Sequence, residues 1–295
     1  MNILSIQSPS GYTRMSFSPA QGGLGCSLIV SDKNGERELL YFPKGFKLEE
    51  YKKVSCGWPF IFPICGRLSR TDGDNRYLYN GKVYTMTIHG FAHKMPWQVL
   101  EHSEHRLVMC LKESERSLLE YPFEFEIILE YEITENHVSC KQTYRNTGDK
   151  PMPYYAGFHP YFSIPFPKDQ VTLDYAPKRR FLYNQVLNDV IGEQPLFSTP
   201  AALTLPELNE SLVELSEDKS VSLSFPDNSS LSMKAEGITD PSLFAYCQLY
   251  HIPSEAFLCI EPWMSHPNAM NTINAVRWLK PGEQELGLLQ LHFKV

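Results

Sequence analysis

The sequence predicts an all-β protein, a single domain in which large, twisted, mostly antiparallel sheets pack as a sandwich. Three observations support this: apolar and polar residues alternate with period two, turn dipeptides separate the alternating segments, and 22 prolines spread through the chain disfavour long helices. All-β chains often exceed 200 residues as one unit. Since no linker, internal repeat or low-complexity tract interrupts the 295 residues, we expect one domain over residues 1–295.

The longest alternation runs from Phe123 to Ile133, where apolar side chains alternate with glutamates apart from one apolar break at Ile128. It resumes in HVSCKQTYRNTG after a turn at Thr134–Asn136, which predicts a long hairpin with one buried face. A short helix is expected at Ser114–Glu120. Further strands are expected at Leu107–Lys112, Val221–Phe225, Leu231–Ala235, Phe257–Glu261 and Gly287–Phe293.

Three dipeptides indicate tight hairpin turns. Asn34-Gly35 and Asn80-Gly81 each lie between short apolar or aromatic segments, and Asp227-Asn228 separates two alternating segments. Asn and Gly adopt the positive backbone φ angles that two-residue hairpin loops require.

Charge and cysteine usage exclude several classes of protein. A net charge of −7 and a pI near 5.7 disfavour nucleic acid or an anionic membrane as a partner. The N-terminus shows no signal-peptide pattern, and no apolar run reaches the roughly 18 residues of a membrane span. The seven cysteines form no CxxC pair. We therefore expect a cytoplasmic protein with free, mostly buried thiols.

Two glycine- and proline-rich segments carry candidate binding residues. In GWPFIFPICGRL, the single charge, Arg67, follows an apolar stretch and either reaches the surface or holds a ligand. In IHGFAHKMPW, His89 and His93 could suggest zinc, but HExxH is not present and Met95-Pro96 prevents a helix. On a strand, residues four apart lie about 13 Å apart, too far to share one metal. His89 is thus expected in the site and His93 at the surface or rim.

Two further segments carry candidate catalytic residues. His159 lies among aromatic residues in AGFHPYF, where a buried structural histidine is the alternative. Glu261 ends the apolar strand FLCIEPW, so burial is expected to raise its pKa toward the range of a general base. The alternative for Glu261 is an ion pair with Arg67.

Together, FPICGRL, IHGFAHKMPW, GFHPYF and CIEPW, in this order, resemble the aldose 1-epimerase (galactose mutarotase-like) superfamily, most closely its divergent bacterial branch that includes LacX-like proteins. The resemblance covers about residues 57 to 263. It implies a β-supersandwich with an open sugar-binding cleft, and an isomerase that interconverts the α and β anomers of a free aldose without cofactor or metal.

The resemblance also implies residue roles. Glu261 matches the base that removes the C1 hydroxyl proton, and His159 matches the acid that protonates the ring oxygen. Arg67 and His89 match substrate-holding residues. Other residues expected to contact the sugar are Gln248, Trp263, Tyr161 and Trp97, the aromatic ones through stacking or as core packing. The partner is then a small sugar, and we expect a monomer or weak homodimer.

Two departures from the family pattern leave alternatives open. The aspartate with which galactose mutarotases grip sugar hydroxyls has no clear counterpart, although Gln248 and Asp240 lie in the region. Where hexose-6-phosphate mutarotases carry a phosphate-binding arginine, this chain has His93; Arg70 and Arg76 could compensate. A neutral sugar is favoured. The alternatives are a hexose-6-phosphate mutarotase and a carbohydrate-binding protein of the same fold without turnover.

Overall fold

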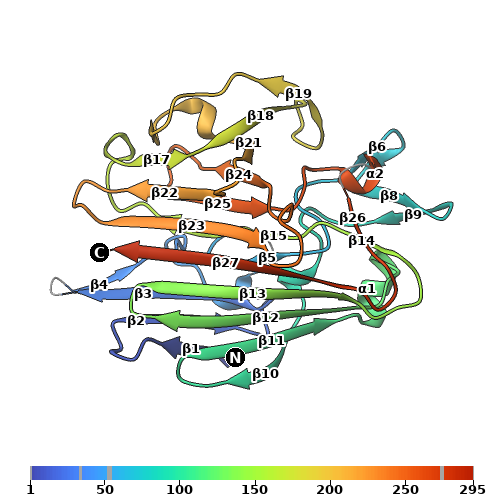
Figure 1. Ribbon diagram of the computed structural model, residues 1–295, viewed down its shortest axis with the longest axis horizontal. Coiled ribbons are helices and arrows are strands. Elements are labelled where there is room, and N and C mark those ends of the chain that lie inside the picture. The colour runs from blue at the N-terminus through green and yellow to red at the C-terminus, as the bar shows by residue number, and fades with distance from the viewer. Residues whose placement is uncertain (1, 33–34, 52–54, 273–275, 295) are drawn as a thin grey trace.

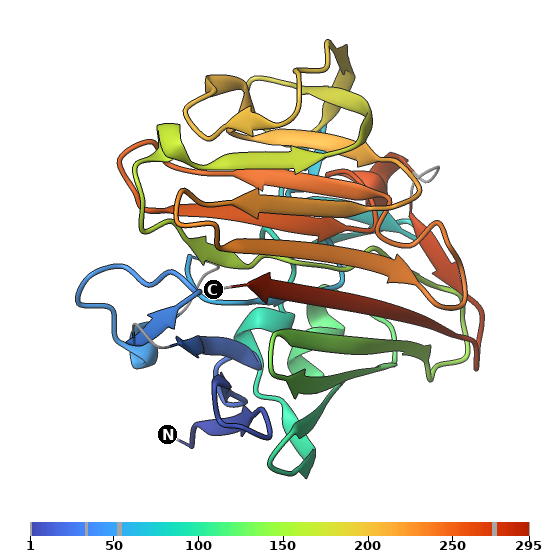
Figure 2. The same cartoon turned by 60° about the vertical axis from the view of Figure 1, so that its left-hand side comes forward.

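The computed structural model describes residues 2–32, 35–51, 55–272 and 276–294, and most of its strands belong to two large sheets (Figures 1 and 2). The first sheet has nine antiparallel strands, whose long members lie one above another across the face seen in Figure 1. In spatial order they are β10 (Gln98–His102), β11 (Arg106–Lys112), β12 (Phe125–Thr134), β13 (His137–Asn146), β27 (Gln284–Lys294), β23 (Ser230–Gly237), β22 (Ser220–Ser224), β17 (Thr172–Tyr175) and β20 (Ala201–Ala202).

The second large sheet has eight strands and carries the residues of greatest functional interest. Its order is β19 (Val190–Gln194), β18 (Pro177–Tyr183), β21 (Ser211–Leu215), β24 (Tyr246–Tyr250), β25 (Phe257–Trp263), β15 (Gly157–Phe158) and β5 (Phe60–Ile61), with β16 (Tyr161–Ser163) also paired to β25. Every residue of β25 is buried, as expected for a strand covered on both faces.

Smaller elements complete the fold. A four-stranded sheet contains β1 (Leu4–Gln7), β2 (Thr13–Ser18), β3 (Leu24–Asp32) and β4 (Gly35–Glu38). Strand pairs are formed by β14 (Met152–Tyr154) with β26 (Arg277–Leu279), β6 (Ser69–Arg70) with β7 (Gly73–Asp74), and β8 (Arg76–Tyr79) with β9 (Lys82–Thr85). The helices are short: α1 (Glu115–Glu120), α2 (Ala269–Thr272) and the 3-10 turns η1 (Leu48–Glu50), η2 (Ala92–Lys94), η3 (Lys168–Gln170) and η4 (Pro206–Leu208).

The structure confirms the expected strands and hairpins with small shifts at their ends. The first strand of the long hairpin begins at Phe125 rather than Phe123, and Phe125, Ile127, Leu129, Tyr131 and Ile133 form its buried row. Asn80 and Gly81 both have positive φ angles between paired Tyr79 and Lys82, as the turn chemistry predicts. Asn228 has a positive φ in the β22–β23 turn. Asn34 lies outside the described residues.

The predicted helix is present, with Ser114 as its N-cap. The Ser114 hydroxyl accepts a hydrogen bond from the Ser117 amide, and the Ser117 hydroxyl accepts one from the Ser114 amide, a reciprocal capping box. No helix among the described residues has the length and hydrophobicity to span a membrane.

One large hydrophobic cluster joins the sheets. It includes Phe17 of β2, Leu129 of β12, Leu212 of β21 and Ile260 of β25, none of them measurably exposed. Because this core is shared by the four-stranded sheet and both large sheets, the strands that carry the site pack against a continuous apolar layer.

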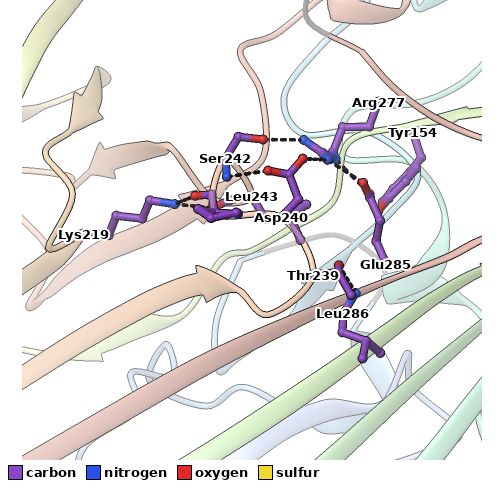
Figure 3. Close-up of polar contacts among 10 residues, drawn as sticks. Tyr154, Lys219, Thr239, Asp240, Ser242, Leu243, Arg277, Glu285 and Leu286 are labelled. Atoms are coloured by element: carbon purple, nitrogen blue, oxygen red, sulfur yellow. Dashed lines mark hydrogen bonds and ion pairs between the residues drawn. The ribbon is translucent and has the colours of Figure 1, made fainter.

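A partly buried polar network ties β14 and β26 to the nine-stranded sheet (Figure 3). Arg277 donates to Asp240 at 2.6 Å and to Glu285 at 2.9 Å, and the Tyr154 hydroxyl donates to the same Glu285 carboxylate. Hydrogen bonding from the Ser242 amide and from Arg277 lowers the pKa of Asp240 to about 2. The network therefore holds Tyr154, five residues before His159, against β27.

This network predicts an acid-dependent loss of stability. The ionised Asp240 stabilises the fold above its unfolded pKa of 3.8, and this contribution disappears as the pH falls through the folded value of about 2. The Asp240 side chain is 41% exposed, so solvent screening limits the effect to about 1 kcal/mol or less. In urea unfolding, Asp240→Asn should lower stability at pH 6 and differ progressively less from wild type toward pH 3.

The matched control is Asp174→Asn, which changes an exposed residue of β17. It should leave the stability curve unchanged over the same pH range. A difference between Asp240→Asn and wild type that stays constant or grows on acidification would contradict the role given to the Asp240 carboxylate.

Candidate active site

His159 and Glu261 are brought together by strand register. Gly157 of β15 lies opposite Trp263 of β25, and Tyr161 of β16 lies opposite Cys259. His159 is midway along the chain between Gly157 and Tyr161, and Glu261 is midway between Cys259 and Trp263. The two residues therefore face each other. Directly opposed side chains in an antiparallel pair point to the same face.

The pair is buried and in close contact. His159 Nε2 and Glu261 Oε2 are 3.3 Å apart, and the residues are 5% and 1% exposed. Burial lowers the pKa of His159, while burial and then the neighbouring Glu210 carboxylate raise the pKa of Glu261. The ion pair of Glu261 with Arg67 that the sequence left open is not formed among the described residues; His159 takes that place.

His89 is fixed by a reciprocal pair of hydrogen bonds with Gly66. The His89 amide donates to the Gly66 carbonyl at 2.9 Å, and the Gly66 amide donates to His89 Nδ1 at 3.1 Å. Since a backbone amide can only donate, Nδ1 must be the acceptor and Nε2 must carry the hydrogen. Burial lowers the pKa of His89, which keeps the ring neutral. Its ring centroid lies 5.2 Å from that of His159, in an edge-on arrangement.

A second carboxylate, Glu210, lies between η4 and β21. Gln248 of β24, which is paired directly with Glu261, donates to Glu210 Oε2 at 3.0 Å and accepts from the Tyr183 hydroxyl at 2.8 Å. Burial raises the pKa of Glu210, and Arg67 and Gln248 partly offset this. Gln248 therefore joins Glu210 to Tyr183 beside Glu261.

These residues line a cavity of about 240 Å³. This is below the roughly 300–1,000 Å³ of clefts that hold drug-sized ligands, so the site suits one small polar molecule. The lining residues are Gly66, Arg67, Ile88, His89, His93, Lys94, His159, Tyr161, Tyr183, Leu187, Glu210, Gln248, Tyr250, Glu261, Trp263 and Pro267. The structure thus brings together every site residue proposed from the sequence except Trp97.

Two expectations about IHGFAHKMPW are wrong. Trp97 does not line the cavity: it is 4% exposed, packs edge-on against Phe60 and donates from Nε1 to the Ala92 carbonyl. His93 is not at the surface but 2% exposed, because the segment turns sharply and enters η2 instead of continuing as a strand. Burial and the neighbouring Lys94 lower the pKa of His93 to about 3, so it is a neutral wall residue.

Sequence reasoning missed several cavity residues. Glu210, Tyr183, Leu187 and Tyr250 come from turns and strand ends with no chemical motif, and Lys94 lies within IHGFAHKMPW but was given no role there. Conversely, Asp240 belongs to the Arg277 network outside the cavity, and Arg70 and Arg76 bind Asp72. The one available signal for Glu210 was its position just before the apolar SLVEL strand.

The cavity is lined by two basic side chains and two carboxyl groups. Arg67 and Lys94 are the basic residues, and Glu210 and Glu261 carry the carboxyl groups. Lys94 Nζ donates to Thr87 Oγ1 at 2.8 Å, and burial lowers the pKa of Lys94. Such a site can exchange a proton through its buried His–Glu pair while the remaining donors and acceptors hold a neutral, hydroxyl-rich molecule.

Comparisons with known proteins found a matching family model and several similar structures. The family model described as Aldose 1-epimerase matches residues 6–284. LacX of Lactococcus lactis subsp. lactis is 30% identical over 126 residues, a match that spans 40% of this chain and 40% of LacX. Among solved structures, the Slr1438 protein from Synechocystis shares a TM-score of 0.83 at 24% identity, with 99% of this chain and 96% of that chain covered. A galactose mutarotase-like protein from Lactobacillus casei gives 0.82 at 21% identity, covering 99% and 100%.

The close approach of the Gly90 backbone to the Phe62 backbone, next to His89, can be tested by measuring stability. Gly90 has a φ of +69°, and a Cβ there would lie 2.2 Å from the Phe62 carbonyl oxygen, which accepts hydrogen bonds from Phe91 and Ala92. Gly81 has a φ of +75° with open space around it. Gly81→Ala should cost only the left-handed strain of about 1–2 kcal/mol. Gly90→Ala should cost several kcal/mol because backbone must also move.

Both variants are to be compared by urea unfolding. Equal losses of stability in Gly90→Ala and Gly81→Ala would show that the segment at His89 is not held tightly against Phe62.

Proposed function

Because the chain belongs to the aldose 1-epimerase family, an isomerase family, we propose that it interconverts the α and β anomers of a free aldose by acid/base ring opening and reclosure. Glu261 removes the C1 hydroxyl proton while His159 protonates the ring oxygen. The ring opens, the C1–C2 bond rotates, and the ring closes on the other face of the carbonyl with the two roles exchanged. The observation that carries the proposal is the buried 3.3 Å contact of His159 with Glu261 inside the cavity.

The proton count of this pair supports the proposal. Burial favours a protonated Glu261 and a neutral His159. This state holds the same single proton as the carboxylate–imidazolium state that the reaction requires, so the two states differ only in which residue holds it. A coupled pair of this kind can donate at one sugar oxygen and accept at another without a net exchange of protons with water.

The other cavity residues fit roles in holding the sugar. Arg67 and His89 Nε2 are hydrogen-bond donors for hydroxyls and for the carbonyl oxygen that develops on ring opening. Glu210, held by Gln248, is an acceptor for hydroxyls. Tyr161 and Trp263 present aromatic surface to sugar C–H groups. Glu210 thus supplies a hydroxyl-binding carboxylate where none was evident in the sequence.

The carboxyl groups in the cavity favour a neutral aldose over a sugar phosphate. Arg67 and Lys94 are the cations that a phosphate would use, but the Glu210 carboxylate and the Glu261 carboxyl group line the same space. Position 93 carries a histidine in place of a permanently charged arginine that could bind phosphate in a bidentate manner, and the buried His93 imidazole is neutral. A binding protein without turnover has less support, because binding alone requires no buried proton-sharing pair.

Replacing the proposed base tests catalysis directly. Glu261→Gln keeps the size of the side chain but cannot accept the hydroxyl proton, so kcat should fall by about 10²- to 10⁴-fold. The assay is polarimetry or NMR exchange across free aldoses and their 6-phosphates. The matched control is Glu214→Gln on β21 of the same sheet, a glutamate paired with Arg179 outside the cavity, which should keep wild-type rates. Acceleration of no sugar by the wild type would refute the catalytic proposal, and acceleration of 6-phosphates alone would establish the phosphorylated alternative.

Replacing Glu210 separates binding from chemistry. Glu210→Gln removes the charged acceptor for hydroxyls, which costs a hydrogen bond worth about 1.5 kcal/mol. KM should therefore rise about tenfold with a much smaller change in kcat. Glu207→Gln, an exposed glutamate in η4, is the control and should change neither. If kcat falls and KM does not change, Glu210 acts through the protonation of Glu261 and not by holding the sugar.

A further inference from the structure

Cys259 places a thiol beside the His159–Glu261 pair. It precedes Glu261 by two residues on β25, so both side chains point to the same face. It is paired with Tyr161 on one side and Tyr250 on the other, and it is fully buried. Ligand atoms of His159, Cys259 and Glu261 all lie within 4.8 Å of one another.

The contact between His159 and Glu261 leaves room for a shared ligand. Nε2 and Oε2 are 3.3 Å apart, yet Oε2 has no hydrogen-bond partner among the described residues. Metal–ligand bonds of about 2.0–2.3 Å place two ligand atoms of a tetrahedral site about 3.3–3.7 Å apart. The imidazole and the carboxylate therefore already stand at the separation of two corners of such a site.

The donor set identifies the class of cation. A thiolate, an imidazole and a carboxylate are the ligand types that zinc takes together, whereas magnesium and calcium take oxygen ligands. Three protein ligands leave a fourth position, which faces the cavity because His159 and Glu261 line it. We propose that His159, Cys259 and Glu261 form a binding site for a thiophilic divalent cation, with Zn²⁺ as the ion that fits best.

Binding requires no redox step. The Cys259 thiol loses its proton to solvent as the sulfur–zinc bond forms, and any proton held by Glu261 leaves in the same way. An occupied site removes both groups of the proton-sharing pair from reaction. The consequence, which depends on the proposed function, is that Zn²⁺ inhibits mutarotation and competes with sugar. Direct measurement of metal binding does not depend on turnover, so the two proposals can fail separately.

The experiment titrates the full-length protein with Zn²⁺ alone by calorimetry, and with Co²⁺ as a spectroscopic substitute that shows a sulfur-to-metal charge-transfer band. One ion per chain and a thiolate band are expected. Loss of a residue that only orients a ligand already costs about 10- to 100-fold in affinity. Cys259→Ser should therefore abolish the band and weaken Zn²⁺ binding by at least about a hundredfold.

Cys26→Ser is the matched control, because Cys26 is the half-buried free thiol most open to nonspecific metal binding, and it should retain both band and affinity. His159→Asn is a second variant that preserves the thiol and should also weaken Zn²⁺ binding. The proposal is overturned by the lack of saturable Zn²⁺ binding, by loss of the band in Cys26→Ser, or by unchanged affinity in Cys259→Ser. If Cys259→Ser does not fold, unchanged affinity in His159→Asn overturns it equally.

Discussion

The antiparallel register between β25 and the broken strand β15–β16 is the constraint on which the rest of the site depends. Gly157 opposite Trp263 and Tyr161 opposite Cys259 leave His159 no position other than opposite Glu261. Pro160 follows His159 at the break and has no amide hydrogen to donate to the ladder. A shift by one residue would turn His159 to the other face of the sheet, because side chains alternate with period two.

The same register continues on the other side of β25. Gln248 of β24 lies opposite Glu261, so Gln248, Glu261 and His159 form one row across three strands. Gln248 then reaches Glu210 outside the row. Glu261 is thereby kept in an apolar strand, where burial raises its pKa, while the Glu210 carboxylate accepts a hydrogen bond from the neutral Gln248 amide. Strand pairing sets the geometry, and burial together with Glu210 raises the pKa of Glu261.

The sequence predicted what depends on local pattern and missed what depends on tertiary contact. Alternation identified the β12–β13 hairpin, and four ordered motifs identified His159, Glu261, Arg67 and His89. The prediction that Trp97 contacts the sugar was wrong because an aromatic residue near a motif packs into the core as readily as it faces a ligand. The predicted position of His93 at the surface or rim was wrong because period-two reasoning assumed a strand where the backbone turns. Glu210 is brought to the cavity by the pairing of β21 with β24, which no short-range pattern encodes.

The site divides physically into a floor and a wall. The floor residues His159, Gln248 and Glu261 belong to paired strands or the junction between them, where ladder hydrogen bonds allow little displacement. Three wall residues, His89, Leu187 and Glu210, have positive φ angles of 61°, 56° and 51°, which cost energy for residues with side chains. Such strain persists only where surrounding contacts enforce it, as the Gly66 hydrogen bonds do for His89. The proposed proton transfer tolerates little displacement of its groups, and the residues proposed for it lie on the sheet. Under the proposed function, selection between sugars falls to the wall, where a turn can change its residue without changing the register of the floor.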